Sequence, residues 1–175
     1  MLYRAHLAAG VGVGAICAGA AHATGLASSP AAVGSVFALV AVFSLLPDLD
    51  TASVVQRWFY RLLFALLVVL LAAGRTEEAA FFATASLMPL LHKHRGWMHR
   101  VWAAGVVPLA ALVCWLLYWR ILRPGDLADG RFLVASLTQE MTSNGIYFLA
   151  MVIGYLIHLA VDFLLPSLFI QSRTR

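Results

Sequence analysis

The sequence predicts an all-α membrane protein with about six transmembrane helices in one bundle, and three observations support this fold class. First, 62% of the 175 residues are hydrophobic and only 11% are charged, whereas a soluble domain carries about 25% charged residues. Second, the mean hydropathy is +0.88, so the chain holds more apolar surface than a core of this size can enclose. Third, the apolar residues form separate runs that fill one domain over residues 1–175 and leave little for a soluble module.

Six apolar segments are the predicted helices. In order they cover residues 7–24, 31–46, 62–73, 79–91, 101–119 and 146–170. The first carries Gly10 and Gly14, whose spacing lets a neighbouring helix approach closely, either within one chain or in a homo-oligomer. It also resembles a cleavable signal peptide that ends at Ala21-His22-Ala23, but we interpret it as the first span.

The third and fourth segments are short, because a span needs about 20 residues. Aromatic residues 58–60 would lengthen the third segment at the membrane interface. The pair is therefore either two full crossings or a hairpin that is tilted or partly inserted. The polar stretch 120–144 is expected to be a loop, with a short amphipathic helix near residues 132–141.

Basic residues near the ends of the segments predict the orientation. With six crossings, one side carries Arg4, Arg57, Arg61, Lys93, Arg95, Arg100, Arg173 and Arg175. The other side carries Arg75, Arg120, Arg123 and Arg131. Since basic residues mark the cytoplasmic side, both termini are expected in the cytoplasm. The net charge of +4 is thus a topology signal, and no nucleic-acid partner is expected.

Polar residues that could bind a metal or act in catalysis are expected on this cytoplasmic side. They are His6, Asp48, Asp50, His92, His94, Arg95, His99, His158 and Asp162. The prediction holds whether the third and fourth segments cross the membrane fully or only enter it. His22 lies at the opposite end of the first segment and is not expected to join them.

His158 and Asp162 are the most specific pair. Four residues apart, they share one face of a helix with Cβ atoms about 6 Å apart. A carboxylate within a span costs roughly 3 kcal/mol or more and is usually paired and functional. The alternative is an isolated hydrogen bond between the two side chains that only stabilises the helix packing.

Two further clusters have structural alternatives. Pro47-Asp48-Leu49-Asp50 ends the second segment, where the carboxylates would act either as helix caps or as ligands of a divalent cation. Residues 92–99 hold three histidines with Gly96 between two of them. A positive-inside loop explains the basic residues of this stretch but not its histidines, and Gly96 permits a turn that directs His94 and His99 to one centre.

The combination resembles a known family. An N-terminal histidine, a PDxD that ends the second span, an HRGxxH turn and an HxxxD in a late span are similar to the YdjM-like bacterial inner-membrane proteins. The resemblance extends from His6 to Asp162 and implies a membrane-bound metal-dependent hydrolase of the inner membrane. The turn differs, because Met98 and Arg100 stand where that family often has small hydroxyl residues. More distantly, the ligand pattern is similar to zinc-dependent phospholipase C and P1 nuclease, which implies phosphoester hydrolysis at a site with several zinc ions.

We therefore expect a hydrolase that uses one or two divalent ions, with zinc as the first choice and manganese or iron as alternatives. The candidate ligands are His6, Asp48, Asp50, His94, His99, His158 and Asp162. In this hypothesis a metal-activated water attacks a phosphoester in a membrane lipid or another amphiphile. Arg95 stabilises the added charge, and Asp50 accepts the proton.

Other function classes are less well supported. The sequence contains no Gly-rich phosphate loop, no HExxH and no GxSxG, which argues against nucleotide hydrolysis and a serine nucleophile. A transporter would need polar residues along a path to both faces, but the outer halves of the segments are nearly all apolar. A structural metal site stays open as an alternative, because spacing does not show whether the coordination sphere closes. A scaffold for lipids or partner proteins would leave the histidines unexplained.

Overall fold

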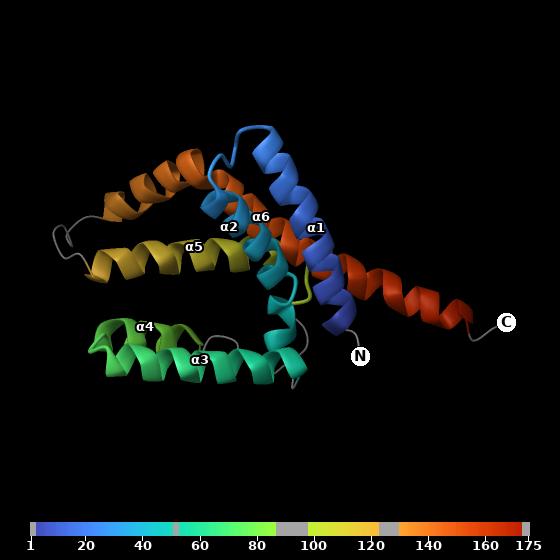
Figure 1. Ribbon diagram of the computed structural model, residues 1–175, viewed down its shortest axis with the longest axis horizontal. Helices are drawn as coiled ribbons and strands as arrows, with labels where there is room; N and C mark the ends of the chain where they lie inside the picture. Colours follow the sequence, from blue (N-terminus) through green and yellow to red (C-terminus); the bar gives the residue numbers. More distant parts are fainter. Residues whose placement is uncertain (1–2, 51–52, 87–97, 123–129, 173–175) are drawn as a thin grey trace.

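All regular elements in the described parts of the chain are helices, as the composition predicts. The computed structural model describes residues 3–50, 53–86, 98–122 and 130–172. In chain order the elements are α1 (Tyr3–Ala23), α2 (Pro30–Phe43), the 3₁₀ helix η1 (Leu46–Asp50), α3 (Val54–Ala72), α4 (Thr76–Ser86), α5 (Ala103–Leu122) and α6 (Gly130–Ser172) (Figure 1). The all-α fold class is confirmed.

Helix α6 is the centre of the molecule, and α1, α2 and α5 all pack against it (Figure 1). Two groups of buried apolar side chains join these helices. The first is Ala18, Ala21, Ala27, Val36, Val40 and Ala150, and the second is Phe43, Ala103, Ala104, Met151 and Tyr155. Close packing of these side chains fixes the position of α6 relative to the end of α1, to α2 and to the beginning of α5.

Three glycines permit this close packing. Gly10 of α1 lies directly against Ser44, and Gly14 lies against Phe37 of α2. Gly154 of α6 lies against the backbone of α2 at Val40, where a Cβ atom would overlap the carbonyl oxygen. The small-residue spacing of the first segment therefore serves contacts within the chain.

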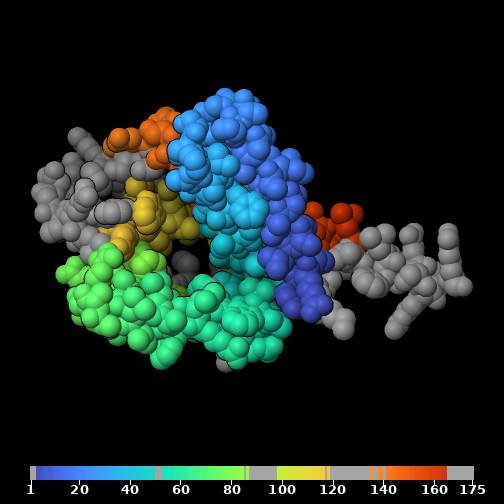
Figure 2. Space-filling model, in the orientation of Figure 1, coloured from blue at the N-terminus to red at the C-terminus, as the bar shows by residue number. Residues whose placement is uncertain are grey.

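Helices α3 and α4 form an antiparallel pair, and α4 also contacts α5 through Phe81 and Phe82, whose rings pack against Tyr118. Helix α3 packs against α4 and η1, and Figure 2 shows a hollow between this pair and the other helices. The turn between them follows Gly74, whose φ of 72° suits glycine. The Arg75 N–H donates to the Leu70 carbonyl (2.8 Å), which completes the end of α3. Large apolar side chains of α3 such as Val69, 63% exposed, lie on the surface, as expected for a lipid-facing helix.

Three helical stretches among the described residues are long and apolar enough to cross a membrane. They are Tyr3–Ala23, Val54–Ala72 and Met141–Leu164, and the shorter apolar helices are Pro30–Phe43 and Ala103–Leu116. A membrane protein with apolar helices is thus supported. The count of six crossings and the cytoplasmic orientation of the termini stay predictions.

Several boundaries differ from the hydropathy pattern. Helix α3 begins eight residues before the apolar run, because the Ser53 side chain caps it by accepting the Gln56 N–H (3.0 Å). Helix α2 ends at Phe43, before the predicted end at residue 46. The expected loop 120–144 is wrong at residues 120–122, which end α5. The short helix expected near residues 132–141 is confirmed, but it is longer than expected: it begins at Gly130 and continues into the last span through a kink at Asn144 (φ −127°, ψ 20°). Hydropathy separated this polar helix from the apolar span that it continues.

Candidate metal centre

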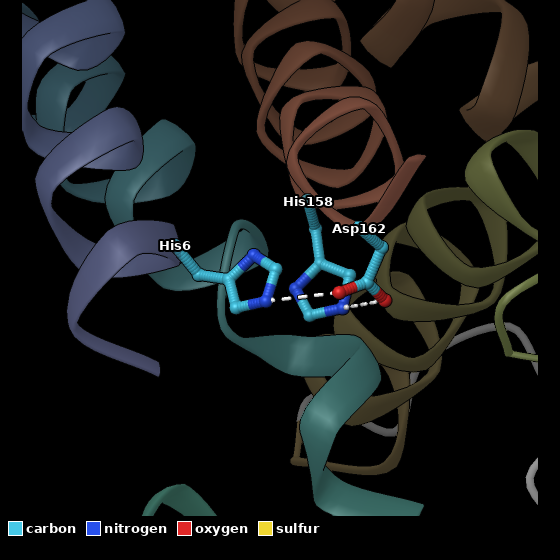
Figure 3. Close-up of side chains that lie close together, drawn as sticks. All are labelled: His6, His158 and Asp162. Carbon is cyan, nitrogen blue, oxygen red and sulfur yellow. Dashed lines mark ion pairs between the residues drawn. The ribbon is translucent and has the colours of Figure 1, made fainter. Parts of the chain in front are cut away.

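Residues from four separate parts of the chain meet in one cluster. His6 comes from the first turns of α1, Asp48 from η1, His99 from the segment before α5, and His158 and Asp162 from α6. Figure 3 shows three of them, with His6 and His158 side by side and Asp162 facing both rings. The predicted convergence of these five positions is therefore seen in the structure. His94 and Arg95 lie outside the described residues, as does the side chain of Asp50.

The Asp162 carboxylate lies at the centre of the cluster and faces three imidazoles. Its Oδ1 is 3.1 Å from His6 Nε2, and its Oδ2 is 3.3 Å from His99 Nε2 and 3.4 Å from His158 Nε2. The helical spacing between His158 and Asp162 thus acts as predicted, because both side chains leave one face of α6. The pair is not isolated, however, since two further histidines contact the same carboxylate.

A backbone carbonyl fixes the tautomer of His158. Its ring is fully buried, and its Nδ1 lies 2.8 Å from the carbonyl oxygen of Ser44. A carbonyl oxygen can only accept, so Nδ1 carries a proton and donates it. In the neutral ring Nε2 is then a bare lone pair directed into the cluster. This arrangement is the usual one for a metal-binding histidine, whose other ring N–H donates to a carbonyl or carboxylate.

The cluster brings hydrogen-bond acceptors together. The bare Nε2 of neutral His158 faces the Asp162 carboxylate oxygen and also lies 3.4 Å from His99 Nε2. Two acceptors at such a distance repel each other unless a proton or a metal cation lies between them. A direct hydrogen bond between His158 and Asp162 would therefore require either a charged imidazolium in a fully buried position or a protonated Asp162 carboxyl group. A divalent cation satisfies the same atoms and leaves His158 neutral.

The spacing of the donor atoms fits a small divalent ion. Three atoms, the Nε2 atoms of His99 and His158 and Oδ2 of Asp162, form a triangle with sides of 3.3, 3.4 and 3.4 Å. Two ligands of a tetrahedral zinc ion lie about 3.3 Å apart, given zinc–nitrogen distances of about 2.0–2.1 Å. Imidazole nitrogen together with carboxylate oxygen is also a donor set that suits zinc, manganese or iron. The residues present therefore fit the metal that the sequence predicts.

His6 stacks on His158 and closes the buried side of the cluster. The two ring centroids are 4.0 Å apart, the planes differ by 16°, and His6 is 1% exposed. Its Nδ1 is buried and has no hydrogen-bond partner within the described residues. A water molecule would satisfy this atom, while Nε2 faces Asp162. His6 can therefore act either as a ligand or as a donor that orients the carboxylate.

Asp48 borders the cluster on its more exposed side. Its Oδ1 is 3.9 Å from His158 Nε2, and its side chain is 18% exposed. Besides the His99–His158–Asp162 triangle, two further groups of ligand atoms are compact enough to hold an ion, namely His6–His158–Asp162 and Asp48–His99–His158. Both need His158, which has a single nitrogen available because Ser44 occupies the other. The two groups cannot both be complete at once, so a second ion would depend on His6 and Asp162 without His158.

Two residues that support the cluster were not among the predicted site residues. Ser44 supplies the carbonyl for His158, and its hydroxyl donates to the carbonyls of Ala41 (2.8 Å) and His6 (3.3 Å). The Tyr155 hydroxyl, fully buried, donates to the carbonyl of Met98 (2.6 Å), the residue before His99. Main-chain acceptors leave no mark in a sequence. The one available signal was Tyr155 itself, one helical turn before His158 on the same face.

Replacing Tyr155 by phenylalanine should loosen His99 without disturbing the other ligands. The variant leaves the buried Met98 carbonyl without its donor, which costs about 1–3 kcal/mol. Because this bond positions the residue next to His99, metal affinity should fall by about 10-fold, at the lower end of outer-shell effects. Isothermal titration of the purified protein with zinc measures the change. Tyr147→Phe is the matched control, and equal affinities for the two variants would contradict the positioning role.

His22 lies apart from the cluster, as predicted. It is in the last turn of α1, and its Nδ1 is 3.3 Å from the carbonyl oxygen of Ala27 in the following turn. The bond ties the end of α1 to the loop that leads into α2. His22 therefore provides a histidine of structural role for comparison with the cluster.

The whole cluster lies within the part of the chain that matches a known protein family. A family model described as "YdjM inner membrane protein" matches residues 1–167 and so includes every residue of the cluster. Neither a curated protein nor a solved structure matches the chain.

Proposed function

The chain belongs to the YdjM inner membrane protein family, and from its buried histidine–aspartate cluster we propose a membrane-embedded metal-dependent hydrolase. The proposed substrate is a phosphoester in a lipid or another amphiphile. The proposed site faces the cytoplasm and holds one or two divalent ions, with zinc as the first choice. One observation carries the metal assignment, which is the bare Nε2 of a neutral His158 facing both His99 and Asp162.

A six-crossing topology with both termini in the cytoplasm is part of this proposal. Helix α1 begins at the cluster, α2 ends beside it, and α3 begins next to η1. The end of α4 lies against the beginning of α3, because the Tyr60 hydroxyl donates to the Ser86 carbonyl (3.1 Å). Helix α5 begins just after His99. This alternation supports a site on the side that carries most of the basic residues.

The residues of the cluster would have separate roles in the proposed reaction. His158, His99 and Asp162 would hold the ion, Ser44 would keep His158 in the binding tautomer, and Tyr155 would position His99. A bound divalent ion supplies a water of lowered pKa and a positive charge for the phosphoryl oxygens. Asp50 stays the proposed proton acceptor and Arg95 the proposed cation for the substrate. Asp48, beside the ligands, is a further carboxylate within reach of the same water.

The surroundings of the cluster favour an amphiphilic substrate. Asp162 is its most exposed member at 32%, so a substrate would reach the ligands from this side. Large apolar side chains flank this approach in the sequence, with Val101 and Trp102 after His99 and Phe163 after Asp162, at 74%, 51% and 83% exposed. A molecule with a polar head and an apolar tail matches this combination better than a soluble phosphoester does.

Metal content and lipid hydrolysis, measured on the same preparation, test the proposal. The detergent-purified protein should contain at least one equivalent of zinc, manganese or iron by elemental analysis. The metal-loaded protein should release phosphate or a phosphorylated headgroup from phospholipid vesicles, and chelator treatment should stop the release. A folded protein that takes up no divalent ion would sink the proposal.

A non-enzymatic metal protein is the second candidate, and one observation favours it. Asp48 lies 3.9 Å from His158 Nε2 and forms a compact group with His99 and His158, so the protein supplies several ligands beside Asp162. A closed coordination sphere is typical of structural zinc, whereas a catalytic site keeps one position for water. Stoichiometric metal with no hydrolysis of any phospholipid would favour this alternative.

A further inference from the structure

A second candidate site lies along the first turns of α3, beside the histidine–aspartate cluster. It is a cavity of about 560 Å³ lined by Gln56, Arg57, Tyr60, Arg61 and Phe64. These residues follow the spacing i, i+1, i+4, i+5 and i+8, so they form one continuous stripe on the helix. A volume of this size accommodates a small ligand or part of a larger one. The proposed hydrolase mechanism uses none of these side chains.

Two arginine side chains border this cavity. Arg57 and Arg61 are both exposed, and neither has a carboxylate partner among the residues that the structure describes. Arg75, at the other end of the same helix, is paired with Glu78 at 2.6 Å. Arg61 also lies over the ring of Trp58, 5.5 Å from its centroid, which limits the positions of its guanidinium. The stripe therefore presents two neighbouring positive charges to the same space.

The cavity is linked to the turn that carries Asp48. The Gln56 side chain, which lines the cavity, donates to the Leu49 carbonyl (2.9 Å). The Ser53 hydroxyl donates to the Asp48 carbonyl (2.9 Å). The first turn of α3 and η1 are thus held together, so the cavity and Asp48 belong to elements that are in direct contact.

The lining changes from polar to apolar along the helix. Gln56 and Arg57 lie at the end nearest η1, and Phe64, two turns further along α3, is 70% exposed. Tyr60 forms a fixed wall between them, because its hydroxyl donates to the Ser86 carbonyl of α4. A polar head with several acceptor oxygens and an apolar tail would complement both ends.

We propose that this stripe binds the phosphate headgroup of an anionic phospholipid, with Arg57 and Arg61 as the phosphate ligands. Guanidinium groups donate two parallel hydrogen bonds to phosphate oxygens, and two arginines one turn apart can share one phosphate. Phosphatidic acid, whose phosphate is terminal, fits this chemistry best. The apolar end of the stripe argues for a lipid over free phosphate. Lipid binding at this stripe goes beyond the proposed function and does not depend on metal binding.

Lipid retention measured by native mass spectrometry tests the proposal. The full-length protein in detergent is incubated with phosphatidic acid or with phosphatidylcholine. The wild type should retain one molecule of phosphatidic acid in preference to phosphatidylcholine. The double variant Arg57→Gln/Arg61→Gln should bind phosphatidic acid at least about 10-fold more weakly, since each lost charge-assisted contact is worth this much or more. Arg75→Gln, on the same helix, should bind as the wild type does.

Two further measurements distinguish lipid binding from binding of free phosphate and from a simple effect of charge. Arg57→Lys keeps the charge but loses the paired donors of the guanidinium group. It should therefore bind phosphatidic acid more tightly than Arg57→Gln/Arg61→Gln and more weakly than the wild type. Displacement of phosphatidic acid by inorganic phosphate would overturn the lipid assignment. Equal retention by wild type and double variant would overturn the site, leaving the arginines as topology signals only. The double variant should keep wild-type metal content, so a metal-free protein would contradict the proposed hydrolase and not this site.

Discussion

Replacing Asp162 by asparagine should abolish stoichiometric metal binding. The carboxylate faces three imidazole nitrogens at 3.1, 3.3 and 3.4 Å, so one substitution removes the anion that all three share. Loss of outer-shell partners alone costs about 10- to 100-fold in metal affinity. Loss of a direct anionic ligand should therefore exceed about 100-fold. Zinc titration followed by calorimetry, with elemental analysis of the dialysed protein, measures the effect.

The matched control is Glu77→Gln, which removes a carboxylate from the exposed first turn of α4. This variant should retain wild-type affinity. His158→Ala and His22→Ala give a second comparison, between a histidine inside the cluster and one at the other end of α1. If Asp162→Asn binds zinc as tightly as Glu77→Gln does, Asp162 is not a ligand and the cluster is a hydrogen-bonded network only.

Replacing Gly154 by alanine should strongly destabilise the protein. The added Cβ would overlap the Val40 carbonyl oxygen and lie 3.0 Å from Phe43 Cβ. Backbone atoms cannot move aside as a flexible side chain can, so α2 and α6 must separate. Overpacking typically costs about 1–3 kcal/mol, and we expect the upper end. The melting temperature in detergent should fall by roughly 6–12 °C.

The same variant should weaken the metal centre, because Ser44 follows Phe43 and holds His158 through its carbonyl. Gly12→Ala serves as the control, since a Cβ there meets nothing within 4 Å. Alanine is a better helix former than glycine, so this control should gain about 0.5–1 kcal/mol. Similar melting temperatures for Gly154→Ala and Gly12→Ala would show that α2 and α6 are not in direct backbone contact at this point.

The fold class could be predicted from composition and hydropathy, because lipid exposure demands apolar side chains on every span. Helix boundaries could not. Ser53 caps α3 well before its apolar run begins, and residues 130–143 are helical despite their polar character. Hydropathy reports which residues tolerate lipid, whereas helix ends depend on caps and turns.

The members of the cluster could be predicted because each was assigned to the same side of the membrane, and a helix bundle brings such residues together. His158 and Asp162 were the clearest case, since helical spacing alone puts them on one face. Their supports could not be predicted. Ser44 acts on His158 through its main-chain carbonyl, and Tyr155 acts on His99 through the carbonyl of Met98. Such contacts depend on three-dimensional packing, and any residue type supplies the same carbonyl.

The contact between His6 and Asp162 joins the first helix of the chain to the last one. About 150 residues separate the two partners, which at synthesis rates of 5–20 residues per second corresponds to about 8–30 s. During that interval a nascent chain carries His6 and Asp48 but lacks both residues of α6. The proposed ion could therefore be bound only late in synthesis, and a truncated chain that ends before α6 would lack two of the proposed ligands.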